Sequence, residues 1–85
     1  MSAANGRIAL GTADAYLGYG DYAKAASMYR AALQKGSVDA SLANTRLGIA
    51  LAMAGNKPEA EAAFKAVTGA RAELAAYWLQ WLQRA

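Results

Sequence analysis

The chain carries one pattern of residue types twice, at a separation of 35 residues. Gly20-Asp21 in the first copy corresponds to Gly55-Asn56 in the second. Small and large apolar residues around these positions also keep their type, in the pairs Ala13 and Gly48, Tyr16 and Leu51, Ala25 and Ala60, and Tyr29 and Phe64. An irregular helical bundle has no physical reason to keep one register across two turns, so the pattern indicates an internal repeat.

Apolar residues recur every three or four positions, and this spacing predicts five α-helices separated by turns that contain glycine. The composition agrees, because the chain has 24 alanines, which favour helix, and 1 proline, which disfavours it. The fourth predicted helix runs through Val67 and ends at Gly69. We therefore expect an all-α protein without a sheet, forming a single domain over residues 1–85.

Two predicted helices have recognisable starts. Asp21 and Asn56 stand where a side-chain oxygen can accept a hydrogen bond from a free backbone N–H of the first turn. Pro58 follows Asn56 within the first turn, where the N–H that proline lacks has no helical partner anyway, and Glu59 completes the pattern. Both hairpin turns should therefore be followed directly by a capped helix.

The two copies resemble the tetratricopeptide repeat, a helix–turn–helix unit of about 34 residues. The resemblance implies a right-handed array of antiparallel helical hairpins, with repeats over about 7–36 and 38–69 and a capping helix over about 70–85. The positions that match are Tyr16, Gly20, Asp21, Tyr22, Ala25, Tyr29 and Ala32 in the first copy, and Leu47, Gly48, Leu51, Gly55, Asn56, Ala60 and Phe64 in the second. The chain departs from the family pattern where Ala9 and Asn44 replace tryptophan, Thr12 replaces leucine, and Ser37 and Ala72 replace proline.

In that family the first helix of each hairpin lines a concave groove that holds a peptide or helical segment of another protein. The resemblance implies the same partner here, in a mixed groove whose basic element comprises Arg7, Arg46 and Arg84. Its implied lining is Arg7, Leu10, Asp14, Leu17, Leu42, Thr45, Arg46, Ile49, Met53, Gln80 and Arg84. The alternative is that Leu10, Leu17 and Ile49 pack against the fifth helix, which would leave a purely structural cap of a larger protein.

The segment from Tyr77 to Leu82 has five large apolar side chains in six residues, more than one core-facing stripe requires. In the favoured interpretation Trp78 and Trp81 close the open end of the array, and Leu74 and Tyr77 pack against the second hairpin. In the other, Trp78, Trp81 and Leu82 mediate self-association, and the partner is a second copy of the chain.

The composition also argues against several functions. The chain has no cysteine and no histidine, and no phosphate-binding loop follows a strand, so we expect no enzyme, cofactor or metal site. The formal net charge is only +3 and the lysines are scattered, which disfavours nucleic acid. A helix-turn-helix nucleic-acid binder using Arg30, Lys35 and Arg46 is the less favoured alternative.

No membrane-spanning helix and no secretory signal is expected from the sequence. The cytoplasm is the favoured location, and the periplasm is the alternative if a signal has been removed.

Overall fold

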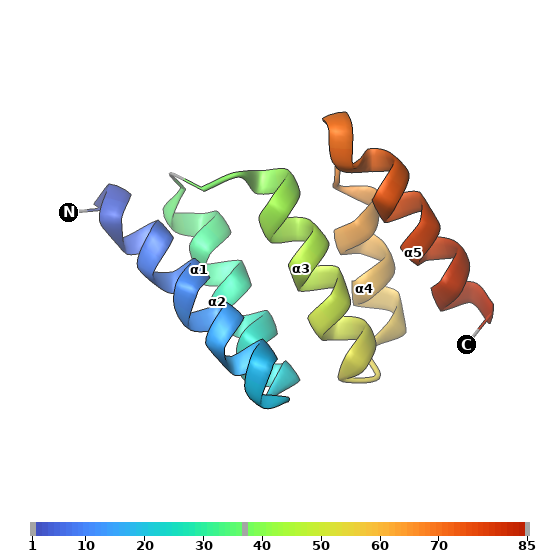
Figure 1. Cartoon of the computed structure of the whole chain (residues 1–85), viewed down its shortest axis with the longest axis horizontal. Helices are drawn as coiled ribbons and strands as arrows, with labels where there is room; N and C mark the ends of the chain where they lie inside the picture. Colours follow the sequence, from blue (N-terminus) through green and yellow to red (C-terminus); the bar gives the residue numbers. More distant parts are fainter. Residues whose placement is uncertain (1, 37, 85) are drawn as a thin grey trace.

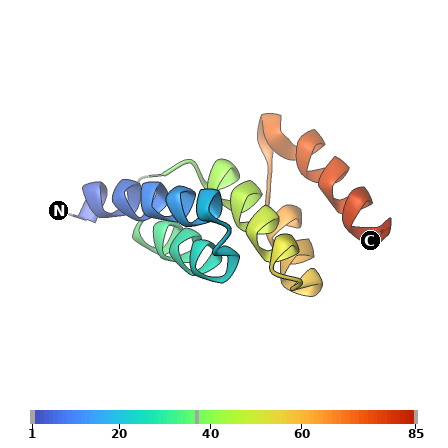
Figure 2. The ribbon, with the colours of Figure 1, turned by 60° about the horizontal axis from the view of Figure 1, so that its bottom comes forward.

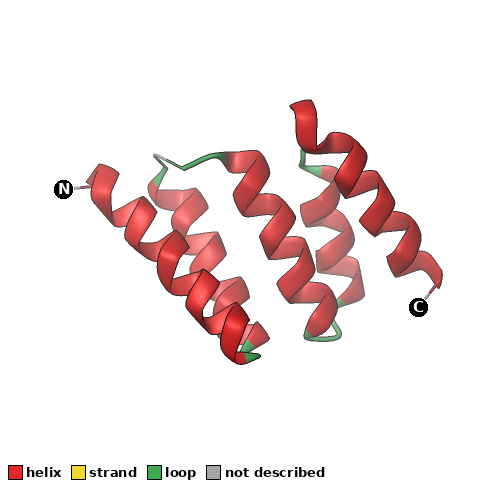
Figure 3. Cartoon of the chain, viewed as in Figure 1, coloured by secondary structure: helices red, strands yellow, loops and turns green. Residues whose placement is uncertain are grey.

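A computed structural model describes residues 2–36 and 38–84. Within these ranges the chain forms five α-helices, one short 3-10 helix and no strand, which confirms the predicted all-α class (Figure 3). The elements in chain order are α1 (Ser2–Tyr19), α2 (Tyr22–Lys35), α3 (Ala40–Met53), α4 (Lys57–Lys65), η1 (Gly69–Arg71) and α5 (Ala72–Arg84).

The helices form a row of antiparallel hairpins. α1 pairs with α2 and α3 pairs with α4, and the contact of α2 with α3 joins the two hairpins (Figure 1). α5 packs mainly on α4, and it lies at the opposite end of the row from α1 (Figure 2). The array is correspondingly flat and elongated, with extents of 41 × 28 × 17 Å.

The turns of the two hairpins have the same geometry. Gly20 and Gly55 both adopt the left-handed conformation that glycine tolerates best, with φ of 84° and 86°. In each turn the backbone N–H of the next residue donates to the carbonyl oxygen five residues earlier, at 2.9 Å and 2.8 Å. Asp21 and Asn56 then cap the following helix by accepting from the backbone N–H three residues on, at 3.4 Å and 3.5 Å. Both predicted caps are confirmed.

The core of each hairpin is built around one large aromatic side chain. Tyr29 in α2 and Phe64 in α4 are fully buried and occupy corresponding positions of the two copies. Small residues lie opposite them, and a β-carbon added at Gly48 would lie only 2.5 Å from Phe64 Cε1. This close crossing favours glycine over alanine in the second hairpin, while the buried Ala13 holds the corresponding position of the first.

The second hairpin is shorter than the sequence predicts. α4 ends at Lys65 rather than near Gly69, and Ala66 forms its C-terminal cap. Val67 and Thr68 follow, and Thr68 adopts an extended backbone. The β-branched side chains of these two residues lower helix propensity. The chain then turns through η1 into α5.

Candidate interaction surface

A polar cluster joins the first three helices. Asp14 of α1 accepts a hydrogen bond from the Tyr29 hydroxyl of α2 and another from Arg46 Nη1 of α3, the latter at 2.7 Å. Burial, and then the hydrogen bond to the Asp14 carboxylate, raise the pKa of Tyr29 above its usual value, so this phenol is a neutral donor. The cluster links the two hairpins through side chains as well as through the packing of α2 on α3.

This pairing changes the character of the predicted groove. Asp14 and Arg46 were both expected to line it, and they bind each other, so the guanidinium of Arg46 has its counter-charge within the chain. Arg7 on α1 and Arg84 on α5 are exposed, but they lie on the helices at opposite ends of the array (Figure 1). The structure therefore does not bring the three arginines together into one basic element.

Several other predicted lining residues belong partly or wholly to the interior. Leu10, Leu17 and Ile49 are half-buried and pack against the core cluster. Leu10 and Leu17 lie on α1, at the other end of the row from α5 (Figure 1), so they do not pack against the fifth helix as the alternative expected. Thr45 is buried, and its hydroxyl donates to the carbonyl oxygen of Ser41 at 2.7 Å. These four residues add little open surface, and Thr45 is a core position rather than a groove position.

Exposed apolar side chains gather instead where the end of α3 faces α5. Met53, Tyr77, Trp78 and Trp81 line an apolar hollow of about 220 Å³, which we call the α3–α5 pocket. Met53 is 50% exposed, Tyr77 71% and Trp81 45%. The predicted groove residue Met53 thus shares one pocket with the two tryptophans that the sequence suggested for self-association.

The tryptophans are held in place by the core. Trp78 stacks on the buried ring of Phe64, with centroids 6.0 Å apart and planes 7° apart. Trp81 meets Trp78 edge to face at 5.5 Å. This aromatic chain fixes the wall of the pocket to the second hairpin. Leu82 is buried in the core cluster and is therefore not available for the self-association predicted for it.

Leu74 and Tyr77 were expected to pack against the second hairpin, but in the structure both side chains are exposed. Together with Trp81 they form an exposed stripe along α5 at positions i, i+3 and i+7, and Leu74 is 47% exposed. That spacing marks one side of a helix and was readable from the sequence. Gln80 and Arg84 lie beside the stripe and form with Tyr77 and Trp81 a smaller hollow of about 80 Å³.

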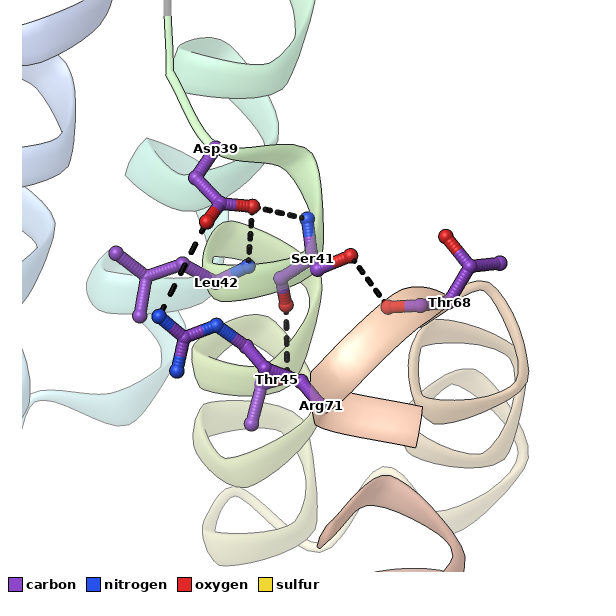
Figure 4. A network of polar contacts seen from close by, with 6 residues as sticks. All are labelled: Asp39, Ser41, Leu42, Thr45, Thr68 and Arg71. Carbon is purple, nitrogen blue, oxygen red and sulfur yellow. Dashed lines mark hydrogen bonds and ion pairs between the residues drawn. The ribbon is translucent and has the colours of Figure 1, made fainter. Parts of the chain in front are cut away.

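A third hollow, of about 550 Å³, lies at the start of α3 and is lined in part by polar residues. Asp39 caps α3 through the backbone N–H groups of Ser41 and Leu42, at 3.0 and 3.2 Å (Figure 4). Its carboxylate also lies 3.9 Å from Arg71 Nη2, and the Ser41 hydroxyl donates to the Thr68 carbonyl oxygen at 2.9 Å. These polar groups bind one another and tie α3 to the segment that leads into α5.

Residues 2–36 and 38–84 contain no group of three or more acidic side chains that could hold a metal ion. No helix formed by these residues is long and apolar enough to cross a bilayer. Comparison of the chain with protein-family models, with curated proteins and with solved structures gives no match.

Proposed function

We propose that the chain is a non-catalytic protein–protein interaction module that binds an apolar peptide or helical segment of a protein at the α3–α5 pocket. The observation that carries this proposal is the gathering of Met53, Tyr77 and Trp81, each about half exposed or more, around one apolar hollow. Contiguous apolar surface on a small protein marks an interaction site, whereas single exposed apolar residues do not.

The residue types also suit binding. Tryptophan and tyrosine are the commonest anchors at the centres of interfaces, because they bury a large area with few rotatable bonds. Trp81 is pre-oriented by its contact with Trp78, which in turn stacks on Phe64. Met53 supplies a flexible apolar side chain that adapts to different partners.

The resemblance to the tetratricopeptide repeat supports the same function, because that family binds protein segments on the first helices of its hairpins. The matched turns at Gly20 and Gly55 and the matched buried rings of Tyr29 and Phe64 agree with such a repeat. Catalysis is disfavoured because the chain has no histidine or cysteine.

A structural cap is the second candidate, favoured by the stacking of Trp78 on Phe64 at the end of the array. Nucleic-acid binding is less well supported. Arg46 is paired with Asp14 and Arg30 with Glu59, so two of the cations it would use already have counter-charges. Phosphate binding would have to compete with these pairs.

Selection of peptides from a random display library tests the interaction function. The chain has 2 tryptophans and both line the pocket, so binding should shift its tryptophan emission to shorter wavelength. Met53→Asp places a charge in the pocket and should weaken binding of the selected peptides at least about tenfold.

The matched control is Ile8→Asp, which introduces the same charge at an exposed apolar residue of α1, far along the array. This variant should bind like the parent. If no peptide is enriched, or if the selected peptides bind the Met53→Asp variant as well as the parent, the pocket is not the binding site and the structural cap is the better account.

A further inference from the structure

We infer that the protein segment which the exposed side of α5 binds is α5 of a second copy of this chain, with the two helices antiparallel. This inference rests on the proposed function, because it names the partner for the same apolar surface. It is drawn from three properties of α5: the apolar stripe, the shape around that stripe, and the placement of its charges.

The stripe has the dimensions of a helix–helix contact. Leu74, Tyr77 and Trp81 recur at i, i+3 and i+7, which is the spacing of an interhelical seam. α5 packs less extensively on α4 than α2 does on α3, and it contacts α3 only sparsely. A second helix could therefore lie along the stripe without displacing any packed helix of its own chain.

The surface around the stripe is also complementary to itself. Tyr77 and Trp81 stand between two hollows, the α3–α5 pocket on the Met53 side and the smaller hollow beside Gln80 and Arg84. A two-fold interface uses the same patch on both copies, so it needs projections and hollows on one surface. Tyr77 and Trp81 of one copy can then enter a hollow of the other.

The charges of α5 select the orientation. Glu73 lies at the start of the helix and Arg84 at its end, about 16 Å apart at the helical rise per residue. Both are exposed, and neither forms an ion pair with any residue in 2–36 or 38–84. An antiparallel pair places Glu73 of each copy beside Arg84 of the other, whereas a parallel pair places like charges together.

One register satisfies both the charges and the aromatic side chains. The midpoint between Glu73 and Arg84 falls within one residue of the midpoint between Tyr77 and Trp81. When the antiparallel helices are aligned on their charges, Tyr77 of one copy therefore lies level with Trp81 of the other. The antiparallel dimer thus places aromatic pairs at its centre and opposite charges at both ends. These contacts make a second copy of the chain the partner that fits this surface.

Sedimentation of the full chain over a range of concentrations tests for the dimer. The parent should change with rising concentration from its monomer mass of 8.9 kDa toward twice that value. Trp81→Ala should weaken self-association at least about thirtyfold, because it removes a central aromatic anchor. Ile8→Ala, which truncates an exposed apolar side chain on α1, is the control and should dimerise like the parent.

Charge reversal tests whether the two α5 helices are antiparallel. Unlike Trp81→Ala, it leaves the aromatic side chains of α5 in place. Glu73→Arg and Arg84→Glu each create two like-charge contacts in their own homodimer and should each weaken it about tenfold. Mixed together, the two variants form a heterodimer in which both contacts pair opposite charges. The mixture should therefore regain the association of the parent, as measured by sedimentation with one variant fluorescently labelled.

A parent chain that stays monomeric at high concentration overturns the inference. A dimer whose charge-reversed variants do not complement each other overturns it as well, because the copies then do not meet through antiparallel α5 helices. Neither result removes the proposed function, since a monomer that binds display-selected peptides in a Met53-dependent way would still be an interaction module.

Discussion

Replacing Gly48 with alanine tests how closely the helices of the second hairpin pack. The added β-carbon would lie 2.5 Å from Cε1 and 2.7 Å from two other ring atoms of Phe64. Apolar carbons normally lie about 3.5–4 Å apart, so the ring or the backbone has to move by about 1 Å. Phe64 cannot turn freely out of the way, because it is 1% exposed and stacked on Trp78.

The expected effect is the difference between two opposing contributions. Overpacking of this kind costs about 1–3 kcal/mol, whereas glycine to alanine in a helix is favourable by about 1 kcal/mol. The free energy of unfolding of Gly48→Ala should therefore fall by about 1 kcal/mol. For a domain of this size that loss lowers the melting temperature by about 4–8 °C, measured by circular dichroism.

Two further variants show whether the clash is the cause. Gly11 lies within α1, and no atom lies in the way of an added β-carbon. The Gly11→Ala variant should therefore be more stable than the parent by about 0.5–1 kcal/mol. Phe64→Leu made together with Gly48→Ala should cost less than the sum of the two single changes, because the smaller side chain relieves the contact. If Gly48→Ala is as stable as the parent or more stable, the close crossing of α3 and α4 is refuted.

Two further predictions concern the caps and the polar cluster. Asp21→Ala and Asn56→Ala should each lower the free energy of unfolding by about 1 kcal/mol in urea titrations, because each removes the side-chain acceptor that caps a helix. A variant as stable as the parent would show that its residue does not cap the helix. Because the pKa of Tyr29 is raised in the folded chain, its phenol ionises at a lower pH in the unfolded chain than in the folded one. The free energy of unfolding should therefore decline from about pH 10 upward. Tyr29→Phe should reduce that decline, and an unchanged alkaline unfolding profile would show that another group is responsible.

The features that follow from local sequence were predictable. Gly20 and Gly55 occupy left-handed positions that few other residues adopt, and the side chains of Asp21 and Asn56 interact with residues only three positions further along the chain. Such interactions depend on nearby residues alone. The need for a small residue at Gly48 followed from comparing the two copies, because the other copy has alanine there.

Features that depend on the relative placement of distant helices could not be predicted. The pairing of Asp14 with Arg46 requires α1 and α3 to lie close enough, a distance that no periodicity encodes. The aromatic run at the C-terminus was ambiguous for a similar reason, because the apolar residues of α5 cover more than one stripe of the helix and the sequence does not say which of them face the core. Only the contact of Trp78 with Phe64 decides that Leu82 faces the core while Tyr77 and Trp81 stay exposed.

Nuclear magnetic resonance titration of the labelled chain with a display-selected peptide tests most directly whether the α3–α5 pocket is an interaction surface. If the pocket binds the peptide, the largest shifts should occur at the methyl group of Met53 and at the two indole N–H signals. Shifts concentrated on α1 and α2, with Met53 and both indoles unchanged, would contradict this prediction.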